Sequence, residues 1–194
     1  MIEVYGQNLG GIWFGVACDQ NQIVASSFSK SQQSTLGNLL KTIPFNLPFQ
    51  VFDSPSDFAE NALTFLKKIY DGENVNASLS LAYTSLHAYT EKVLKATLQI
   101  PIGYVASYGA IAKTVGGSPR AVGNVMASNP FAPIVPCHRV VKSNFTLGGY
   151  GGGLEVKVEL LNRECRGFQT SRQVQIGDGA LTIFPAEYVL KNLV

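Results

Sequence analysis

Two early stretches of the chain are rich in β-branched and aromatic residues. Residues 12–18 (IWFGVAC) and 23–29 (IVASSFS) flank the polar segment 19–22 (DQNQ). Short hydrophobic runs on either side of a polar turn are typical of a β-hairpin. Residues 34–40 (STLGNLL) indicate a short helix, and residues 45–52 (FNLPFQVF) indicate a loop or an edge strand, because proline cannot donate to a sheet ladder.

A longer helix is predicted from residues 54–57 (SPSD), which offer a serine cap, a proline in the first turn and an acid close behind. The hydrophobic residues that follow keep helical spacing: Phe58, Ala62, Leu63, Leu66 and Ile69. Gly72 ends this helix. Residues 77–83 (ASLSLAY) then alternate as in a strand. Residues 1–84 are therefore predicted to form an α/β domain.

The second section of the chain is patterned mainly as helices. Residues 85–98 predict a helix that stops before Pro101, and residues 107–130 predict two short helices separated by a pair of glycines. Ser107 can cap the first of them and Ser118 the second. Two short helices around a tight turn have the shape of a helix-turn-helix, although many such pairs bind nothing.

The second of these short helices has small residues on its surface, namely Ala121, Gly123 and Ala127. They permit a close backbone approach, and they also suit packing against another helix. Arg120 lies in the first turn, where the helix dipole disfavours a cation by roughly 0.3–1 kcal/mol. Arg120 is therefore a candidate for binding an anion or a base edge, and a solvated arginine is the alternative.

The net charge of +2 conceals an asymmetry along the chain. Residues 1–84 carry four Lys against seven Asp and Glu, whereas residues 85–168 carry nine Lys and Arg against four Glu. Residues 169–194 carry two charges of each sign. A basic section beside an acidic one suggests that the basic section meets a polyanion, with a solvated basic face as the alternative.

The cysteine and histidine content argues for a reduced cytoplasmic protein without a metal or another cofactor. Cys18, Cys137 and Cys165 are an odd number, are widely spaced and form no CxxC pair, so a disulfide framework is not expected. With only two histidines, a zinc site is not expected either. The sequence contains no apolar run that predicts a membrane span and no signal peptide pattern at residues 1–11.

Cys137 and His138 are adjacent in the proline-rich segment 129–141 (NPFAPIVPCHRVV). A cysteine nucleophile acts as its thiolate, and a neighbouring imidazole or guanidinium favours that form. The prolines predict an extended chain, in which successive side chains point to opposite faces, so contact between the two groups requires a bridging water or a turn. A buried structural cysteine is the alternative.

His138 needs an acceptor to fix its tautomer. Glu155, Glu159 and Glu164 are candidates on the helix that is predicted from about Leu154, after a glycine-rich loop. That loop lacks the ending of a phosphate-binding loop. Residues 169–194 predict a hairpin and a short helix, without a functional interpretation.

Residues 120–141 (RAVGNVMASNPFAPIVPCHRVV) closely resemble the active-site region of the O6-alkylguanine-DNA alkyltransferases, also called methylated-DNA–protein-cysteine methyltransferases. The resemblance covers about 89–167. It implies an α+β protein: an RNase-H-like α/β domain at 1–84, then a mainly helical, winged-helix-like domain at 85–168 that contains the helix-turn-helix. Residues 169–194 extend past the usual end of the family.

The resemblance implies direct reversal of DNA damage. Family members flip O6-alkylguanine out of double-stranded DNA and transfer the alkyl group irreversibly to their own cysteine, once per molecule. Cys137 matches the acceptor, and His138 matches the base that activates it through a water. Glu164 matches the carboxylate that holds this histidine, and Asn129 matches the asparagine that shapes the site.

Other positions match residues that contact DNA or the flipped base. Arg120 matches the arginine that fills the gap in the base stack, and Tyr108 matches the tyrosine that helps to rotate the nucleotide. The small residues Ala121 and Gly123 fit a helix that lies in the minor groove. The resemblance places two further residues at the pocket that receives the base: Tyr150, in the segment GGYGGG, and Pro136, in the segment VPCHR.

The protein is accordingly expected to act as a monomer on double-stranded DNA that contains O6-alkylguanine, without a membrane partner. Three alternatives remain open: a lesion sensor that transfers nothing, a helix-turn-helix transcription factor, and a cysteine hydrolase. Ala132 stands where some relatives have a proline, a difference that affects which bulky adducts would fit.

Overall fold

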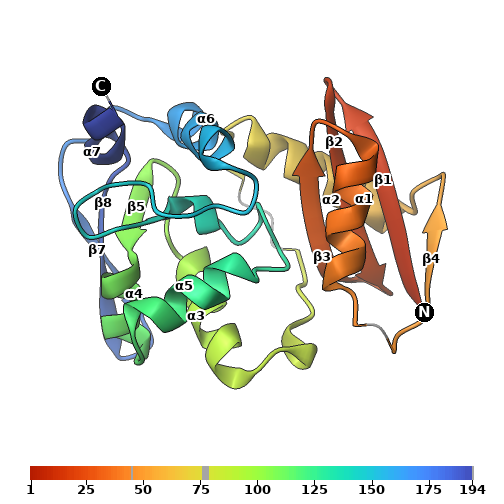
Figure 1. Cartoon of the computed structure of the whole chain (residues 1–194), viewed down its shortest axis with the longest axis horizontal. Helices are drawn as coiled ribbons and strands as arrows, with labels where there is room; N and C mark the ends of the chain where they lie inside the picture. The colour runs from red at the N-terminus through yellow and green to blue at the C-terminus, as the bar shows by residue number, and fades with distance from the viewer. Residues whose placement is uncertain (45, 76–78, 194) are drawn as a thin grey trace. The chain divides into compact units, whose positions relative to one another are not determined.

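The computed structural model describes residues 1–44, 46–75 and 79–193, and these residues divide into two compact units (Figure 1). The first unit consists of Met1–Ser85 together with Pro130–Ile134. The second consists of Leu86–Asn129 and Val135–Val194. The short segment Pro130–Ile134 thus packs with the first unit, although the sequence-based division assigned it to the second domain.

The first unit contains a four-stranded sheet in the order β3-β2-β1-β4. The predicted hairpin is confirmed as β2 (Ile12–Asp19) and β3 (Gln22–Ser29), which pair antiparallel. Strand β1 (Ile2–Leu9), which pairs antiparallel with β2, was not predicted from the sequence. Strand β4 (Phe49–Phe52) pairs parallel with β1 and is an edge strand, one of the two options predicted for this segment.

Two helices cover the sheet of the first unit, α1 (Gln32–Thr42) and α2 (Asp57–Tyr70). Both were predicted, but the α2 cap differs from the predicted one. Ser56 accepts the hydrogen bond from the Ala59 backbone amide at 3.4 Å, and Pro55 precedes the helix instead of lying in its first turn. The reason is that Ser56, in extended backbone geometry, is followed directly by acidic Asp57, which the helix dipole stabilises.

A strand was predicted at residues 77–83, but residues 79–83, the described part of this segment, do not form one. Residues 76–78 lie outside the described residues, and of the remainder only Leu81 forms an isolated bridge, to Ile23. The short 3-10 helix η1 (Tyr83–Ser85) follows, so the next helix begins later in the chain than predicted. That helix, α3, spans Ala88–Leu98 instead of beginning at Ser85.

The predicted pair of short helices is confirmed in the second unit as α4 (Tyr108–Val115) and α5 (Pro119–Ala127). Ser107 accepts from the Ala110 amide at 3.0 Å, and Ser118 accepts from the Ala121 amide at 3.2 Å. Between them Gly116 and Gly117 have φ values of +91° and +95°, a region that residues with a side chain rarely adopt. The two serines and two glycines therefore define where each helix begins and where α4 ends.

The second unit also has a four-stranded sheet, in the order β6-β5-β8-β7. Its strands are β5 (Tyr104–Ser107), β6 (Val140–Val141), β7 (Arg172–Ile176) and β8 (Gly179–Pro185). The hairpin predicted within residues 169–194, here called the tail, is confirmed as β7 and β8. Strand β8 also pairs antiparallel with β5. This unit is thus less purely helical than predicted, because the tail adds two strands to its sheet.

The remaining helices of the second unit are α6 (Leu154–Glu164), α7 (Glu187–Leu190) and the terminal 3-10 helix η3 (Lys191–Leu193). One hydrophobic cluster joins α6 and α7 to the sheet: Val105, Val141, Leu147, Leu161, Ala186 and Val189. The tail thus belongs to the core of this unit. Within the described residues, every helix is too short or too polar to cross a membrane.

Candidate active site

Cys137 lies in a turn, not in extended chain. Residues Cys137–Arg139 form the 3-10 helix η2, with Pro136 at φ −80° and ψ 66°. The Arg139 amide donates to the Pro136 carbonyl at 2.9 Å, which closes the turn. The extended conformation that the prolines predicted is therefore wrong at this point, because proline lacks only its own N–H, and its carbonyl still accepts the turn-closing bond. Contact between the side chains of Cys137 and His138 had been expected to require such a turn or a bridging water.

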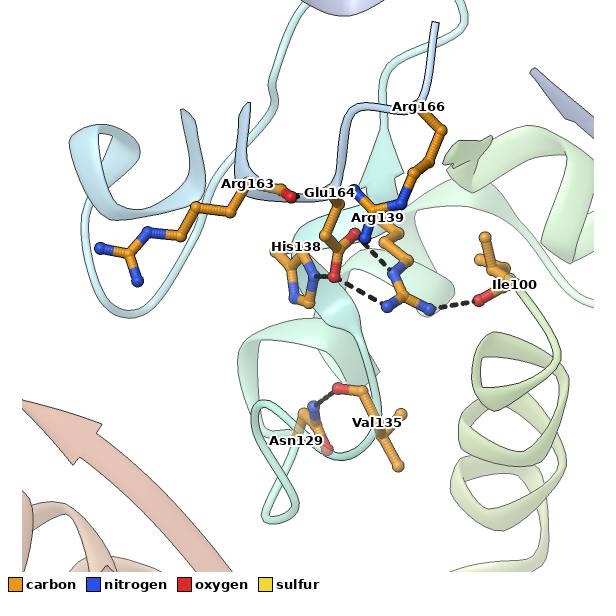
Figure 2. A network of polar contacts seen from close by, with 8 residues as sticks. All are labelled: Ile100, Asn129, Val135, His138, Arg139, Arg163, Glu164 and Arg166. Atoms are coloured by element: carbon orange, nitrogen blue, oxygen red, sulfur yellow. Dashed lines mark hydrogen bonds and ion pairs between the residues drawn. The ribbon is translucent and has the colours of Figure 1, made fainter. Parts of the chain in front are cut away.

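A buried network joins His138, Arg139 and Glu164 (Figure 2). His138 Nε2 lies 2.9 Å from Glu164 Oε1, and Arg139 donates to both carboxylate oxygens, from Nε at 2.8 Å and from Nη2 at 2.7 Å. Glu164 is 1% exposed and His138 is 0% exposed. Of the three glutamates considered from the sequence, Glu164 is the one that meets His138, whereas Glu159 pairs with Arg163.

The charges in this network set its protonation. Burial alone would raise the pKa of Glu164, but His138 and Arg139 outweigh it and lower this pKa to about 2. Burial lowers the pKa of His138, against the opposing effect of Glu164, so the imidazole is neutral near pH 7. With Nε2 donating to the carboxylate, Nδ1 carries the lone pair, and it makes no hydrogen bond to another described residue. The second ring nitrogen is thus able to accept a proton.

The thiol of Cys137 is protonated at rest. Its side chain is buried, and burial raises the pKa of the thiol, against the hydrogen bond from Asn129 and the charge of Lys157. Asn129 also donates from Nδ2 to the Val135 carbonyl at 2.9 Å, which ties together the two points where the chain leaves and re-enters this unit (Figure 2). A reaction that uses the thiolate therefore needs a base.

Lys157 is a site residue that the sequence analysis missed. It is fully buried on α6, and its Nζ donates to the carbonyls of Val140 at 2.6 Å, Leu147 at 2.5 Å and Gly149 at 3.3 Å. Burial lowers its pKa to about 8. A signal was present, since Lys157 precedes Leu160 and Leu161 by three and four residues and so lies on the apolar face of the helix.

Cys137 opens into a cavity of about 400 Å³. The cavity is lined by Tyr108, Gly123, Met126, Ala127, Cys137, Gly149, Tyr150 and Gly151. Tyr150 is held in a largely apolar setting, and burial raises its pKa. The glycines among these residues leave the cavity wide, because they add no side chains to its wall.

The structure brings some of the predicted residues together at this cavity and leaves others apart. Tyr108, Gly123 and Tyr150 line it with Cys137, whereas Arg120 is exposed at the start of α5. Ala121 and Pro136 are not among the lining residues. Met126 was missed by the sequence analysis, since a methionine on a helix is usually a core residue. Among the described residues, no three His, Cys, Asp or Glu side chains gather as a metal site would require.

The Cys137 thiol thus lies at the wall of a cavity that α4 and α5 help to form, and the next residue, His138, is neutral and held by Glu164. A cysteine with these neighbours is typical of cysteine-dependent proteins, and a helix-turn-helix is shared by many proteins that bind nucleic acids. Comparison with known proteins narrows this class. Residues 88–166 match the family model described as 6-O-methylguanine DNA methyltransferase, DNA binding domain.

A named relative extends the match over most of the chain. The methylated-DNA–protein-cysteine methyltransferase of Thermococcus gammatolerans is 33% identical over 168 residues, covering 84% of this chain and 94% of that protein. The protein of the same name from Pyrobaculum aerophilum is 57% identical over 74 residues, but the match spans only 50% of its length and 38% of this chain.

Solved structures agree with these sequence matches. The O6-methylguanine-DNA methyltransferase of Pyrococcus kodakaraensis superimposes with a TM-score of 0.65 at 30% identity, covering 84% of this chain and 99% of that one. The Mycobacterium tuberculosis OGT, solved in complex with DNA, gives a TM-score of 0.66 at 28% identity, covering 84% and 92%. The chain belongs to the methylated-DNA–protein-cysteine methyltransferase family.

Proposed function

We propose that this protein repairs O6-alkylguanine in double-stranded DNA by flipping the damaged base into the cavity and moving its alkyl group onto Cys137. The observation that carries the proposal is the position of Cys137 at a cavity of about 400 Å³, beside the buried His138–Glu164 pair. That volume is within the usual range for pockets that enclose a small organic group. Family membership and the complex of the Mycobacterium tuberculosis protein with DNA support DNA as the partner.

The transfer itself is a proton movement followed by a displacement. His138 Nδ1 accepts the thiol proton of Cys137 through a water molecule, and Glu164 stabilises the resulting imidazolium. The thiolate attacks the alkyl carbon, an S–C bond forms and the C–O bond to the base breaks. The electron pair of that bond stays with the guanine, which takes up a proton. Asn129 and Lys157 favour the thiolate, since both lower the pKa of Cys137.

Binding of the damaged DNA is assigned to the helix-turn-helix. Helix α5 lies in the minor groove, where Ala121 and Gly123 permit close approach, and Arg120 fills the space that the flipped base leaves. Tyr108 helps to rotate the nucleotide, and Tyr150 lines the space around the base. Pro136 shapes that space indirectly, through the turn that holds Cys137. The excess of basic residues in 85–168 favours the phosphate backbone.

The finer description of the fold is also proposed. The order α3, β5, α4, α5, followed by the hairpin β7–β8 that returns to pair with β5, is the order of a winged helix, with the hairpin as its wing. The first unit is assigned an RNase-H-like fold by family resemblance. The protein acts as a monomer, and its three free cysteines suit a reducing cytoplasm.

The experiment that tests this function follows the alkyl group of an O6-methylguanine duplex. Under the proposed function the group leaves the DNA and arrives on the protein. A lesion sensor would bind the duplex and leave it alkylated, and a transcription factor would show no response to the lesion.

Replacing Arg120 with alanine is expected to slow transfer from duplex DNA by about tenfold or more and transfer from the free base O6-benzylguanine much less. The reason is that flipping costs a few kcal/mol, of which the inserted side chain recovers a part, and about 1.4 kcal/mol corresponds to a factor of ten. Single-turnover rates on both substrates measure the difference. Lys113→Ala, another exposed cation near the turn, is the matched control. Equal slowing on both substrates would show that Arg120 acts elsewhere.

A further inference from the structure

The tail of the second unit lies beyond the residues that match the family model, which end at 166. It nevertheless packs against the segments that carry the candidate site. The cluster that contains Ala186 and Val189 also contains Leu147 and Leu161, which lie in the loop before the cavity glycines and on α6. The tail is therefore in direct contact with two parts of the chain on which the site depends.

The first contact is at the end of α6, immediately after Glu164. Glu187, the first residue of α7, accepts at Oε1 from the backbone amides of Arg166 at 3.2 Å and Gly167 at 2.6 Å. Burial raises the pKa of the Cys165 thiol to about 11, and the Glu187 carboxylate adds to this shift. One side chain of the tail thus holds the backbone amides of Arg166 and Gly167 and interacts with the thiol of Cys165, the residue that follows Glu164. Figure 1 shows α7 beside the ribbon that leads away from α6.

The second contact is with the loop that leads to the cavity. The Phe145 ring lies 5.1 Å from the Phe184 ring and 5.5 Å from the Tyr188 ring, both edge-on. Two residues further, Leu147 is buried in the cluster with the tail and offers its carbonyl to Lys157. The tail therefore fixes the loop at the point from which Gly149 and Tyr150 enter the cavity wall.

The third contact is with β5, the strand that leads into Tyr108. Strand β8 pairs with β5 through Tyr104 and Val105, and the Ala186 amide donates to the Gly103 carbonyl at 2.9 Å. Each of the three segments that present Tyr108, Tyr150 and Glu164 is thus bound to the tail by backbone hydrogen bonds or ring contacts.

We propose that residues 172–193 are a positioning element of the active site and that Glu187 is its key positioning residue, acting on Glu164 through the backbone of Arg166 and Gly167. This inference rests on the proposed function for its biological meaning. The positioning role requires only that displacement of Glu164 weakens the hydrogen bond between its carboxylate and the His138 ring. A hydrophobic cap that merely covers apolar surface would not need the two amide bonds to Glu187.

The test compares Glu187→Ala with wild type at two levels. The Nε2–H proton of His138, bonded to Glu164 and buried, is expected to give a downfield NMR signal protected from solvent exchange. The other histidine, His87, is exposed and gives no such signal. In Glu187→Ala the His138 signal is expected to broaden or disappear while the protein stays folded, and transfer from O6-methylguanine DNA is expected to slow by about tenfold.

Three further variants separate positioning from folding. Glu187→Gln keeps an oxygen that can accept from the two amides and is expected to restore the signal and most of the rate. Glu187→Asp keeps the charge on a shorter side chain and replaces the alanine variant in the test if that variant does not fold. Its His138 NMR signal and its transfer rate are both expected to be intermediate. Asp178→Ala, at the exposed turn of the β7–β8 hairpin, is the control and should change neither.

A folded Glu187→Ala or Glu187→Asp protein with a wild-type His138 signal and rate would overturn the inference, and so would a loss that Glu187→Gln does not restore. The NMR signal does not depend on alkyl transfer. If it responds as expected while even wild type never accepts an alkyl group, the positioning role stands and the proposed function fails.

Discussion

Replacing Cys137 with alanine is expected to abolish alkyl transfer and to leave DNA binding nearly unchanged. No other group at the cavity can form the new bond to the alkyl carbon as a thiolate does. Affinity for DNA, in contrast, should depend mainly on contacts with phosphates, and the thiol is 7% exposed at the cavity wall. Gel-shift titration of an O6-methylguanine duplex and single-turnover assays measure the two properties.

Cys18→Ala is the control, since Cys18 is a free thiol on β2 of the first unit and does not line the cavity. It should transfer alkyl groups at close to the wild-type rate. Residual transfer in Cys137→Ala, or complete loss of DNA binding in that variant, would count against the assignment of Cys137.

The second large effect is expected for Glu164→Gln. Glutamine keeps the size of the side chain but leaves Arg139 and the protonated form of His138 without a counter-charge. Loss of one partner of a buried ion pair costs about 3 kcal/mol or more of the free energy of unfolding. Transfer should slow by about 100-fold, since general-base catalysis of this kind is worth that much or more.

The pH dependence of stability provides an independent check on Glu164. Its pKa is lowered from 4.5 to about 2 in the folded protein, so its stabilising contribution is complete above about pH 4.5 and is lost as the pH falls toward 2. Urea denaturation at neutral and acid pH should show a smaller acid loss in Glu164→Gln than in wild type. Glu155→Gln, exposed in the first turn of α6, is the control, and the same acid response in both variants would contradict this account.

Local sequence patterns anticipated the elements whose signals are themselves local. The β2–β3 hairpin, the serine caps of α4 and α5, and the tail hairpin depend on neighbouring residues, and all three were predicted. Strand β1 was missed because IEVYGQNL mixes polar residues and a glycine into a strand that is largely defined by pairing with β2 and β4. Such long-range pairing is not visible in a local pattern.

The candidate site also combines residues that the sequence predicted with features that depend on contacts between distant segments. The motif around Cys137 drew attention to the thiol, and family resemblance singled out Glu164 among three glutamates that spacing alone left open. The spacing of Lys157 from Leu160 and Leu161 placed it on the apolar face of α6, but its role was missed because its burial depends on three carbonyls brought together by the loop and β6. The turn at Cys137 was likewise hidden, since three nearby prolines favoured extended chain.

We expect each protein molecule to accept one alkyl group on Cys137 and then to stop. A thioether has no carbonyl for water to attack, so the His138 relay cannot regenerate the thiol. The most direct test mixes the protein with an excess of duplex containing one O6-methylguanine and measures the intact protein mass. The expected result is a gain of a single methyl group, mapped to the peptide that contains Cys137. An unchanged mass, or a methyl group on Cys18 or Cys165, would contradict this expectation, as would repair of many duplexes by each protein molecule.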